Sequence, residues 1–153
     1  MKAKKIIALM SAVVLMGSAA LPVAASETKT TTLQAAIPST YTLSIPLAQS
    51  ITLDATSTDI GTIEVTGNIK PTEKVVVTVD AQEFKNKDKA GDTIAYTLVA
   101  GDTVFTEAQW SETDLQAANP ATYDLAVKIA EEQWNNASAG NYEAVITFTA
   151  TIK

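Results

Sequence analysis

The sequence predicts an all-β domain that folds as a single antiparallel β-sandwich, with its strands connected as an immunoglobulin-like Greek key. Short runs rich in Thr, Val and Ile alternate apolar with polar side chains, which is typical of strands with one buried face. Turn signals separate these runs at intervals of about 8–12 residues. No alternating helical pattern supports a parallel sheet. A closed β-barrel is the alternative architecture.

The N-terminal residues have the features of a secretory signal peptide. Residues 2–5 include three Lys, and residues 6–21 are apolar without a charge. Residues 22–25 (Pro-Val-Ala-Ala) end the run with the small residues after which a signal peptidase cleaves. We therefore predict a signal peptide over residues 1–25, cleaved after Ala25, which leaves residues 26–153 as one domain. An uncleaved anchor is the alternative, although the apolar run is shorter than the roughly 20 residues of a membrane span.

The composition excludes several classes of function. The 153 residues contain 11 Lys, 17 acidic residues and no Arg, His or Cys. Cleavage would remove three Lys and no acid, so the formal charge would change from −6 to −9. Such a charge disfavours nucleic acid and anionic membrane surfaces. Without His and Cys, disulfides, lipoprotein acylation, the common catalytic triads and zinc sites are excluded.

Apolar alternation predicts where the strands lie. The clearest strand covers residues 142–152, where six alternate apolar positions follow the Gly140-Asn141 turn. Shorter alternations, bounded by Pro, Asp or Gly, predict further strands. They cover residues 41–45, 51–53, 60–69, 75–79 and 94–98, and the last lies between two Gly-Asp-Thr turns (91–93 and 101–103).

Residues 123–134 leave two alternatives open. They alternate as a strand directly after the breaker Pro120. Ala126, Ala130 and Trp134 are four residues apart, however, and could line one face of a helix. We favour the strand because its alternation begins immediately after the proline.

Between Phe105 and Pro120 the strand alternation is lost. Thr113 and Gln116 resemble a capping box, which predicts one helical turn. Trp110 lies in this irregular segment, where an exposed aromatic ring could stack on a sugar. Trp110 is therefore the candidate ligand-binding residue. The alternative is a loop anchor over one open end of the sandwich.

Carboxylate pairs are the remaining catalytic possibility, because a glycosidase needs only two. Glu107, Glu112 and Asp114 lie in the irregular segment and could converge, but nothing in their spacing requires it. Glu131 and Glu132 are adjacent, so on a strand they would point to opposite faces. We interpret these acids as solvated surface residues and predict no catalytic site.

Residues 86–92 resemble part of a calcium loop, since Asn86, Asp88 and Gly91 fit its first, third and sixth positions. The fifth and twelfth positions, Ala90 and Thr97, do not fit. A polar hairpin loop is the favoured interpretation, and we expect no metal and no cofactor. The tripeptide 136–138 (Asn-Ala-Ser) matches a glycosylation acceptor, a pattern that is common by chance.

The segment Thr28–Ile37 has two possible roles. Exported β-proteins can assemble by lending a strand to the open sheet edge of a neighbour. This Thr-rich segment has apolar side chains only at Leu33, Ala35 and Ile37, which is few for such a strand. We favour an ordinary first strand of the domain.

Motifs near both ends of the chain resemble a known group. The first are Ile37-Pro38-Ser39-Thr40-Tyr41-Thr42-Leu43-Ser44-Ile45-Pro46, Ile60-Gly61 and Val65-x-Gly67. The second is Trp134-x-x-Ala137-x-Ala139-Gly140-x-Tyr142-x-x-x-Ile146-Thr147-Phe148-Thr149. These motifs are similar to those of small secreted surface proteins of Gram-positive bacteria, although residues 83–122 match nothing there. The resemblance implies a released or cell-surface β-sandwich of immunoglobulin-like or fimbrial-subunit type, and it brings no catalytic motif.

We therefore expect a non-enzymatic secreted or cell-surface protein that is structural or adhesin-like, such as a fimbrial-type subunit or a surface interaction module. A glycan-binding module that uses Trp110 is the alternative, and a carboxylate hydrolase is the third hypothesis. The expected partners are further copies of the chain or a surface glycan, with no nucleic acid and no membrane insertion after cleavage. No LPxTG-like signal or apolar tail precedes Lys153, so we expect release or non-covalent retention at the surface.

Overall fold

The computed structural model describes residues 27–153, so the predicted signal peptide over residues 1–25 lies outside the described residues. Contacts divide the chain into two units, residues 1–35 and residues 36–153. In the first unit, residues 27–35 form no helix or strand and their side chains are exposed. The prediction that Thr28–Ile37 forms the first strand of the domain is wrong. Its few apolar side chains cannot bury a strand face, and those of Leu33 and Ile37 are 91% and 75% exposed.

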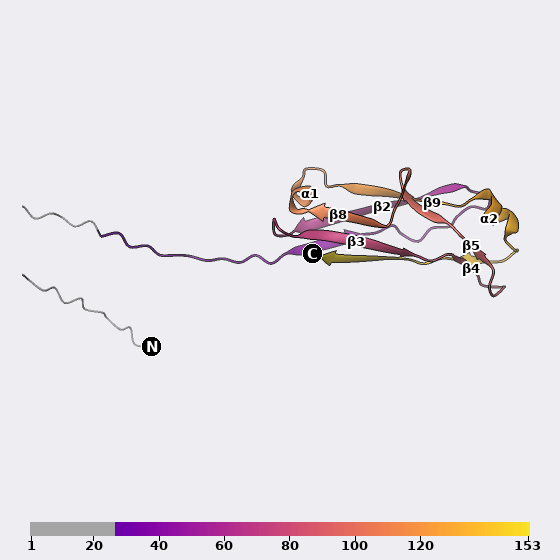
Figure 1. The fold of residues 1–153 in the computed structure, drawn as a ribbon, viewed down its shortest axis with the longest axis horizontal. Helices are drawn as coiled ribbons and strands as arrows, with labels where there is room; N and C mark the ends of the chain where they lie inside the picture. The colour runs from indigo at the N-terminus through magenta and orange to yellow at the C-terminus, as the bar shows by residue number, and fades with distance from the viewer. Residues whose placement is uncertain (1–26) are drawn as a thin grey trace, which may run out of the picture. The chain divides into compact units, whose positions relative to one another are not determined.

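Strands dominate residues 36–153, and all their pairings are antiparallel (Figure 1). The strands are β1 (Thr40–Ser44), β2 (Ser57–Asn68), β3 (Lys74–Ala81), β4 (Phe84–Asn86), β5 (Thr93–Ile94), β6 (Thr97–Ala100), β7 (Thr103–Val104), β8 (Glu107–Ser111), β9 (Thr122–Lys128), β10 (Tyr142–Glu143) and β11 (Ile146–Ile152). Two short helices, α1 (Glu112–Gln116) and α2 (Glu131–Asn136), lie at opposite ends of the strands.

The strands form three open sheets. The largest has the order β1-β2-β9-β6-β7, and the other two have the orders β11-β3-β8 and β10-β4-β5. Each order has two ends, so no sheet formed by residues 27–153 closes on itself. The closed-barrel alternative is therefore wrong for this part of the chain, and the prediction of an all-β fold with antiparallel sheets is confirmed.

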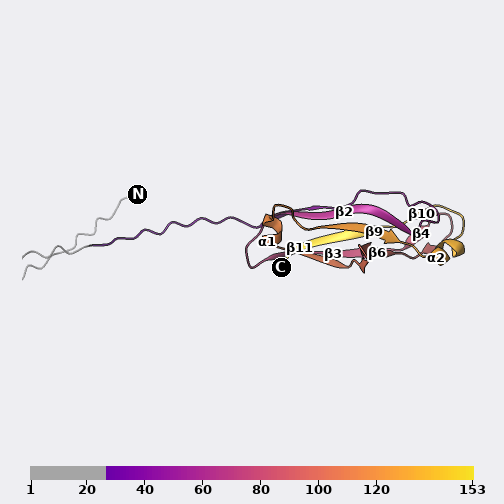
Figure 2. The ribbon, with the colours of Figure 1, turned by 90° about the horizontal axis from the view of Figure 1, so that it is seen from above.

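The five-stranded sheet and the β11-β3-β8 sheet share one apolar core. Figure 2 shows β2 and β3 in different layers, with β11 beside β3. Fully buried side chains come from both layers and from the segments that connect them. The largest are Trp110, Ile63, Ile94, Leu125, Ile129, Val65, Val75 and Val77. Burial of each such side chain contributes about 1.5–3 kcal/mol, so this shared core stabilises the two layers together.

A β-bulge in β2 explains why the apolar positions of that strand change phase. The register with β9 shifts between Asp59 and Gly61, which leaves Ile60 as the extra residue. Ile60 and Ile63 can then both be buried, although they are three residues apart. Gly61 has a φ of 111°, a conformation that L side chains rarely adopt. Pro46 lies over this position, so the bulge meets the segment that follows β1.

Four predicted strands differ from the structure. The strand over residues 94–98 is interrupted at Ala95 and Tyr96 and is divided into β5 and β6, which belong to different sheets. The strand over residues 142–152 is divided into β10 and β11, because its partner strand is interrupted at the same level, between β3 and β4. Residues 51–53 form no strand, since the chain turns at Leu53 and Asp54, where φ is 63°. The strand over residues 123–134 ends at Lys128, and α2 follows it. Both alternatives for that stretch were therefore half right.

The segment between Phe105 and Pro120 contains more structure than its sequence predicts. The predicted helical turn is confirmed as α1, but its capping box uses Ser111 and Asp114 and not Thr113 and Gln116. Strand β8 precedes it and was missed. Pairing with β3 positions β8, and this long-range contact has no signature within the segment itself.

Candidate functional site

Trp110 lies in strand β8 and not in an irregular segment, and its side chain is 0% exposed. Its Nε1–H donates a hydrogen bond to the Ala121 carbonyl at 2.7 Å, and its ring meets Tyr123 edge-on with centroids 5.3 Å apart. The strand alternation turns Trp110 toward the core with Ala108. A fully buried indole has no free face for a sugar, so the exposed ring on which the glycan hypothesis depends is absent at this position.

The candidate carboxylates hold local hydrogen bonds. Asp114 Oδ2 accepts from the N–H and hydroxyl of Ser111 at 2.8 and 2.6 Å, and hydrogen bonding from Ser111 holds the pKa of Asp114 below its ordinary value. Glu107 Oε1 accepts from Gln109 at 2.7 Å. Glu131 and Glu132 lie in the first turn of α2 and not on a strand, where they favour the helix N-terminus. Asp114 therefore caps α1, whereas no side-chain hydrogen bond caps the start of α2.

The loop between β4 and β5 is the polar hairpin that the sequence favoured. Asn86 Oδ1 accepts from the N–H groups of Asp88 and Lys89. Asp92 Oδ2 accepts from the Tyr142 hydroxyl at 2.8 Å and from the Ser138 N–H at 3.1 Å. Hydrogen bonding from Ser138, and then from Tyr142, lowers the pKa of Asp92. This Asp92 cluster fastens the hairpin to the start of β10.

Within the part of the chain that the structure describes, no group of three or more His, Cys, Asp or Glu side chains could hold a metal ion. Asn136 of the possible glycosylation tripeptide is the last residue of α2. The Ser138 hydroxyl accepts a hydrogen bond from Lys89 Nζ at 2.7 Å. The tripeptide therefore adjoins the Asp92 cluster.

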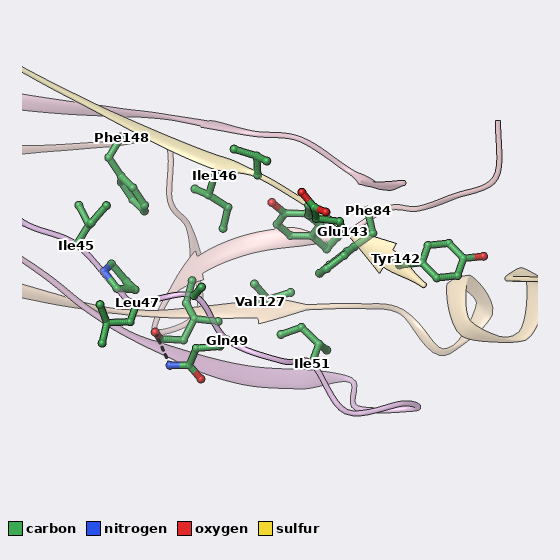
Figure 3. A pocket seen from close by; sticks show the side chains of 16 residues that line it. Ile45, Leu47, Gln49, Ile51, Phe84, Val127, Tyr142, Glu143, Ile146 and Phe148 are labelled. Carbon is green, nitrogen blue, oxygen red and sulfur yellow. Dashed lines mark hydrogen bonds between the residues drawn. The ribbon is translucent and has the colours of Figure 1, made fainter. Parts of the chain in front are cut away.

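An apolar groove of about 420 Å³ lies where β1 has ended and the chain crosses toward β2 (Figure 3). The crossing segment 45–51 forms one wall, with Ile45, Leu47 and Ile51. Residues 142–146 and Phe148, from β10 to the start of β11, form the other wall, and the base includes Phe84, Tyr96 and Val127. Of the described residues that line the groove, only Glu143 is charged, and it pairs with Lys87 at 2.9 Å.

Gln49 and Tyr96 both line the groove, but only the side chain of Gln49 has a hydrogen-bond partner among the described residues. The Gln49 side chain donates to the Ile60 carbonyl at 2.9 Å, so it covers part of the β2 edge that β1 leaves unpaired. The Tyr96 hydroxyl is buried and has no hydrogen-bond partner among the described residues. Burial, together with the charge of Asp80, raises the pKa of Tyr96. A buried hydroxyl without a hydrogen-bond partner is costly to the folded state.

Strand β11 has an uncovered edge beside this groove. Lys153 and Lys74 exchange both backbone hydrogen bonds, at 2.8 and 2.9 Å. Bonding direction alternates along a strand, so Ile146, Phe148, Ala150 and Ile152 direct their N–H and C=O groups away from β3. No strand among residues 27–153 pairs with that edge. One contact reaches it from β1, where the Tyr41 hydroxyl donates to the Ala150 carbonyl at 3.0 Å.

The composition of this region is unusual in an acidic chain. Neither residues 40–53, which hold β1 and the crossing segment, nor residues 144–152, which hold β11, contain a charged residue. We call the surface formed by these two runs the β1–β11 side. Sequence reasoning missed it as a site, although the absence of charge from two separate runs was visible. That the runs meet depends on the sheet order.

A comparison with known protein families finds no family model that matches this chain, and no curated protein matches it. Among the helices of residues 27–153, none is long and apolar enough to cross a membrane. The site must therefore be interpreted from its own geometry: an apolar groove, an uncovered strand edge and a side without charge.

Proposed function

We propose that the protein is a non-enzymatic, secreted or cell-surface structural or adhesin-like subunit that acts through protein contacts. The proposal rests on the uncovered edge of β11. An edge strand with free N–H and C=O groups is a template for another strand, and proteins that avoid such pairing place charges, prolines or bulges there. Residues 144–152 contain no charge and no proline. The resemblance that the sequence motifs at residues 37–46, 60–61, 65–67 and 134–149 bear to small secreted Gram-positive surface proteins, which no family model matches, points to the same assignment.

We also infer that the strands follow an immunoglobulin-like Greek key. The order β1-β2-β9-β6-β7 supports this inference, because β9 lies between strands that are far from it in sequence. Connections that pass from one layer to the other, as from β2 to β3 and from β8 to β9, are typical of such sandwiches. In this arrangement the two sheet ends at β1 and β11 come to the same side, which is the side proposed to make contacts.

The oligomeric state of the purified protein tests the proposed function. We expect size-exclusion chromatography with light scattering to give a mass above that of the monomer, increasing with protein concentration. Negative-stain microscopy would then distinguish closed complexes from fibres. A strict monomer at high concentration would remove the self-assembling subunit from consideration.

The glycan-binding alternative has lost its candidate residue. Tyr41 and Tyr142 are partly exposed, but each hydroxyl is already used within the molecule. We therefore place a protein partner ahead of a sugar. A glycan array that showed binding unaffected by added copies of the protein would reverse this order.

A further inference from the structure

The free edge of β11 is complementary to the same edge of a second copy of the chain. If two copies lie antiparallel about a two-fold axis through Thr149, all seven residues of each β11 face a residue of the other strand. Residues whose backbone groups point outward then face each other, so both strands use their free N–H and C=O groups. The facing pairs are Ile146 with Ile152, Phe148 with Ala150, Thr147 with Thr151, and Thr149 with itself.

These facing pairs are of kinds that stabilise sheets. On the inner face, Ile meets Ile and an aromatic ring meets a small side chain, which avoids crowding. On the outer face, where Thr147, Thr149 and Thr151 are exposed, Thr meets Thr throughout. The Ala150 carbonyl accepts from Tyr41 but keeps a second lone pair for the new strand. A shift of the pairing by one residue would be unfavourable. The free N–H and C=O groups of one copy would then face residues of the other copy whose backbone groups already bond β3.

Charge also favours a second copy at this edge. The chain carries a formal charge of −6, so two copies repel each other across most approaches. The β1–β11 side contributes no charge to that repulsion. Apolar side chains flank the edge: Ile45, Leu47 and Val145 are 50%, 85% and 56% exposed. Each lines the groove and would lose exposed surface in a pair, which is favourable by about 25 cal/mol per Å².

We propose that two copies of this chain pair through β11, antiparallel about Thr149, and join their β11-β3-β8 sheets into one continuous sheet. This inference rests on the proposed function and names the partner at its site. The interface is isologous, so it closes at two copies and forms a pair rather than a fibre. Any larger assembly would use a different surface, such as the exposed segment Thr28–Ile37.

A cysteine scan tests the pairing, because the chain contains no Cys and each single variant therefore carries one thiol per copy. At a non-hydrogen-bonded pair the two Cα atoms of residue 149 would be about 4.5 Å apart, which a disulfide can bridge. We expect Thr149→Cys to give a disulfide-linked pair under mild oxidation. Thr147→Cys is the matched control: its two thiols would lie four residues, or about 13 Å, apart along the strands. Cross-linking of Thr149→Cys should be on the order of tenfold faster or more.

A double variant guards against misfolding at position 149. Thr147→Cys with Thr151→Cys should cross-link as Thr149→Cys does, because these two residues face each other in the pair. Circular dichroism of each variant would show whether the fold is kept. Equal rates for Thr149→Cys and Thr147→Cys would indicate random collision and would overturn the proposal.

The outcomes also separate this inference from the proposed function. If the unmodified protein associates while neither Thr149→Cys nor the double variant cross-links, the β11 pairing is wrong and the protein-contact function stands. If, in addition, deletion of residues 28–37 abolishes association, the segment that contacts the neighbouring copy is residues 28–37 and not β11. A strict monomer without cross-linking would remove both the β11 pairing and the self-assembling form of the proposed function.

Discussion

The five-stranded sheet and the β11-β3-β8 sheet end in β7 and β8 on one side of the sandwich, which we call the β7–β8 side, and in β1 and β11 on the other. The end strands of the two sides differ in length, charge and covering. On the β7–β8 side, β7 has only two residues, and β8 carries Glu107. The N–H of Ser111, at the end of β8, donates to Asp114 at 2.8 Å and is no longer free for another strand. On the β1–β11 side, β11 has seven residues and no charge, and its outer backbone groups have no partner strand among the described residues.

This difference indicates that the uncovered edge is not a general property of the fold. Natural sheets block their edges with short strands, charges and covering segments, and the β7–β8 side uses the first two together with a helix cap. Pro46 and Gln49 cover part of the free β2 edge. Within residues 27–153, the end strands β1 and β11 both lack charges and prolines, and β11 is the longer of the two, with seven residues against five, which is why we place the contact there.

The largest effect should come from Trp110, the fully buried residue that β8 contributes to the core. Replacing it with Ala removes a fully buried ring and its hydrogen bond to Ala121. We expect Trp110→Ala to lower the free energy of unfolding by about 3–5 kcal/mol, as measured by urea denaturation. Trp110→Phe keeps most of the apolar volume and should cost less, with association unchanged. Full stability in Trp110→Ala would contradict the burial of this residue.

A charge introduced on β11 should weaken association, whereas a charge introduced on β8 should not. Thr149→Glu places two like charges against each other in the β11 pair, and we expect association at least about tenfold weaker, or about 1.4 kcal/mol. Gln109→Glu is the matched control, on the exposed face of β8 in the same sheet. It should leave association unchanged. Thr149 is exposed, so Thr149→Glu should keep its unfolding free energy within about 0.5 kcal/mol, whereas Gln109→Glu loses the hydrogen bond to Glu107 and should stay within about 1 kcal/mol. Equal effects on association would mean that the contact is not at β11.

Local patterns predicted those strands whose burial follows a simple period. Strand β3 places Val75, Val77 and Val79 in or against the core as expected, although Val76 is buried as well, and the inward positions of β11 are those that its sequence indicates. Strand β8 was missed because only Ala108 and Trp110 point inward, which is too short an alternation to detect. The burial of Trp110 depends on Tyr123 and on β3, both distant in the sequence.

The candidate site could be predicted even less, because it depends on the order of strands within sheets. The sequence shows that residues 40–53 and 144–152 lack charge. It does not show which strand edge is free, because that depends on the sheet order, in which β11 pairs with β3 and with no other described strand. The division of the last strand into β10 and β11 has the same origin, since it depends on the break between β3 and β4. Sheet order is a long-range property that no local pattern encodes.

The smallest expected effect concerns what holds the start of the uncovered strand. Asp92 accepts from Tyr142 of β10, and its pKa in the folded protein is lowered from the ordinary value of 3.8. A lowered pKa means that the folded state binds the proton less readily than the unfolded state. The stability that the Asp92 carboxylate contributes is therefore present above pH 3.8 and is lost as the pH falls through the lowered pKa. Asp114 and Glu73 act in the same direction.

Asp92→Asn should reduce this acid sensitivity without removing it, because Asp114 and Glu73 keep their carboxylates. The amide oxygen can still accept from Tyr142 and Ser138, so the variant should stay folded at neutral pH. Urea midpoints measured at pH 7 and below pH 3.8 would give the comparison. We expect the urea midpoint to fall less with acid for Asp92→Asn than for the unmodified protein. Asp88, whose carboxylate accepts from Asn141, lies in the same hairpin, so Asp88→Asn is the matched control. An unchanged fall would show that the Asp92 cluster does not hold β10, leaving its pairing with β4 as the main constraint at the start of the open edge.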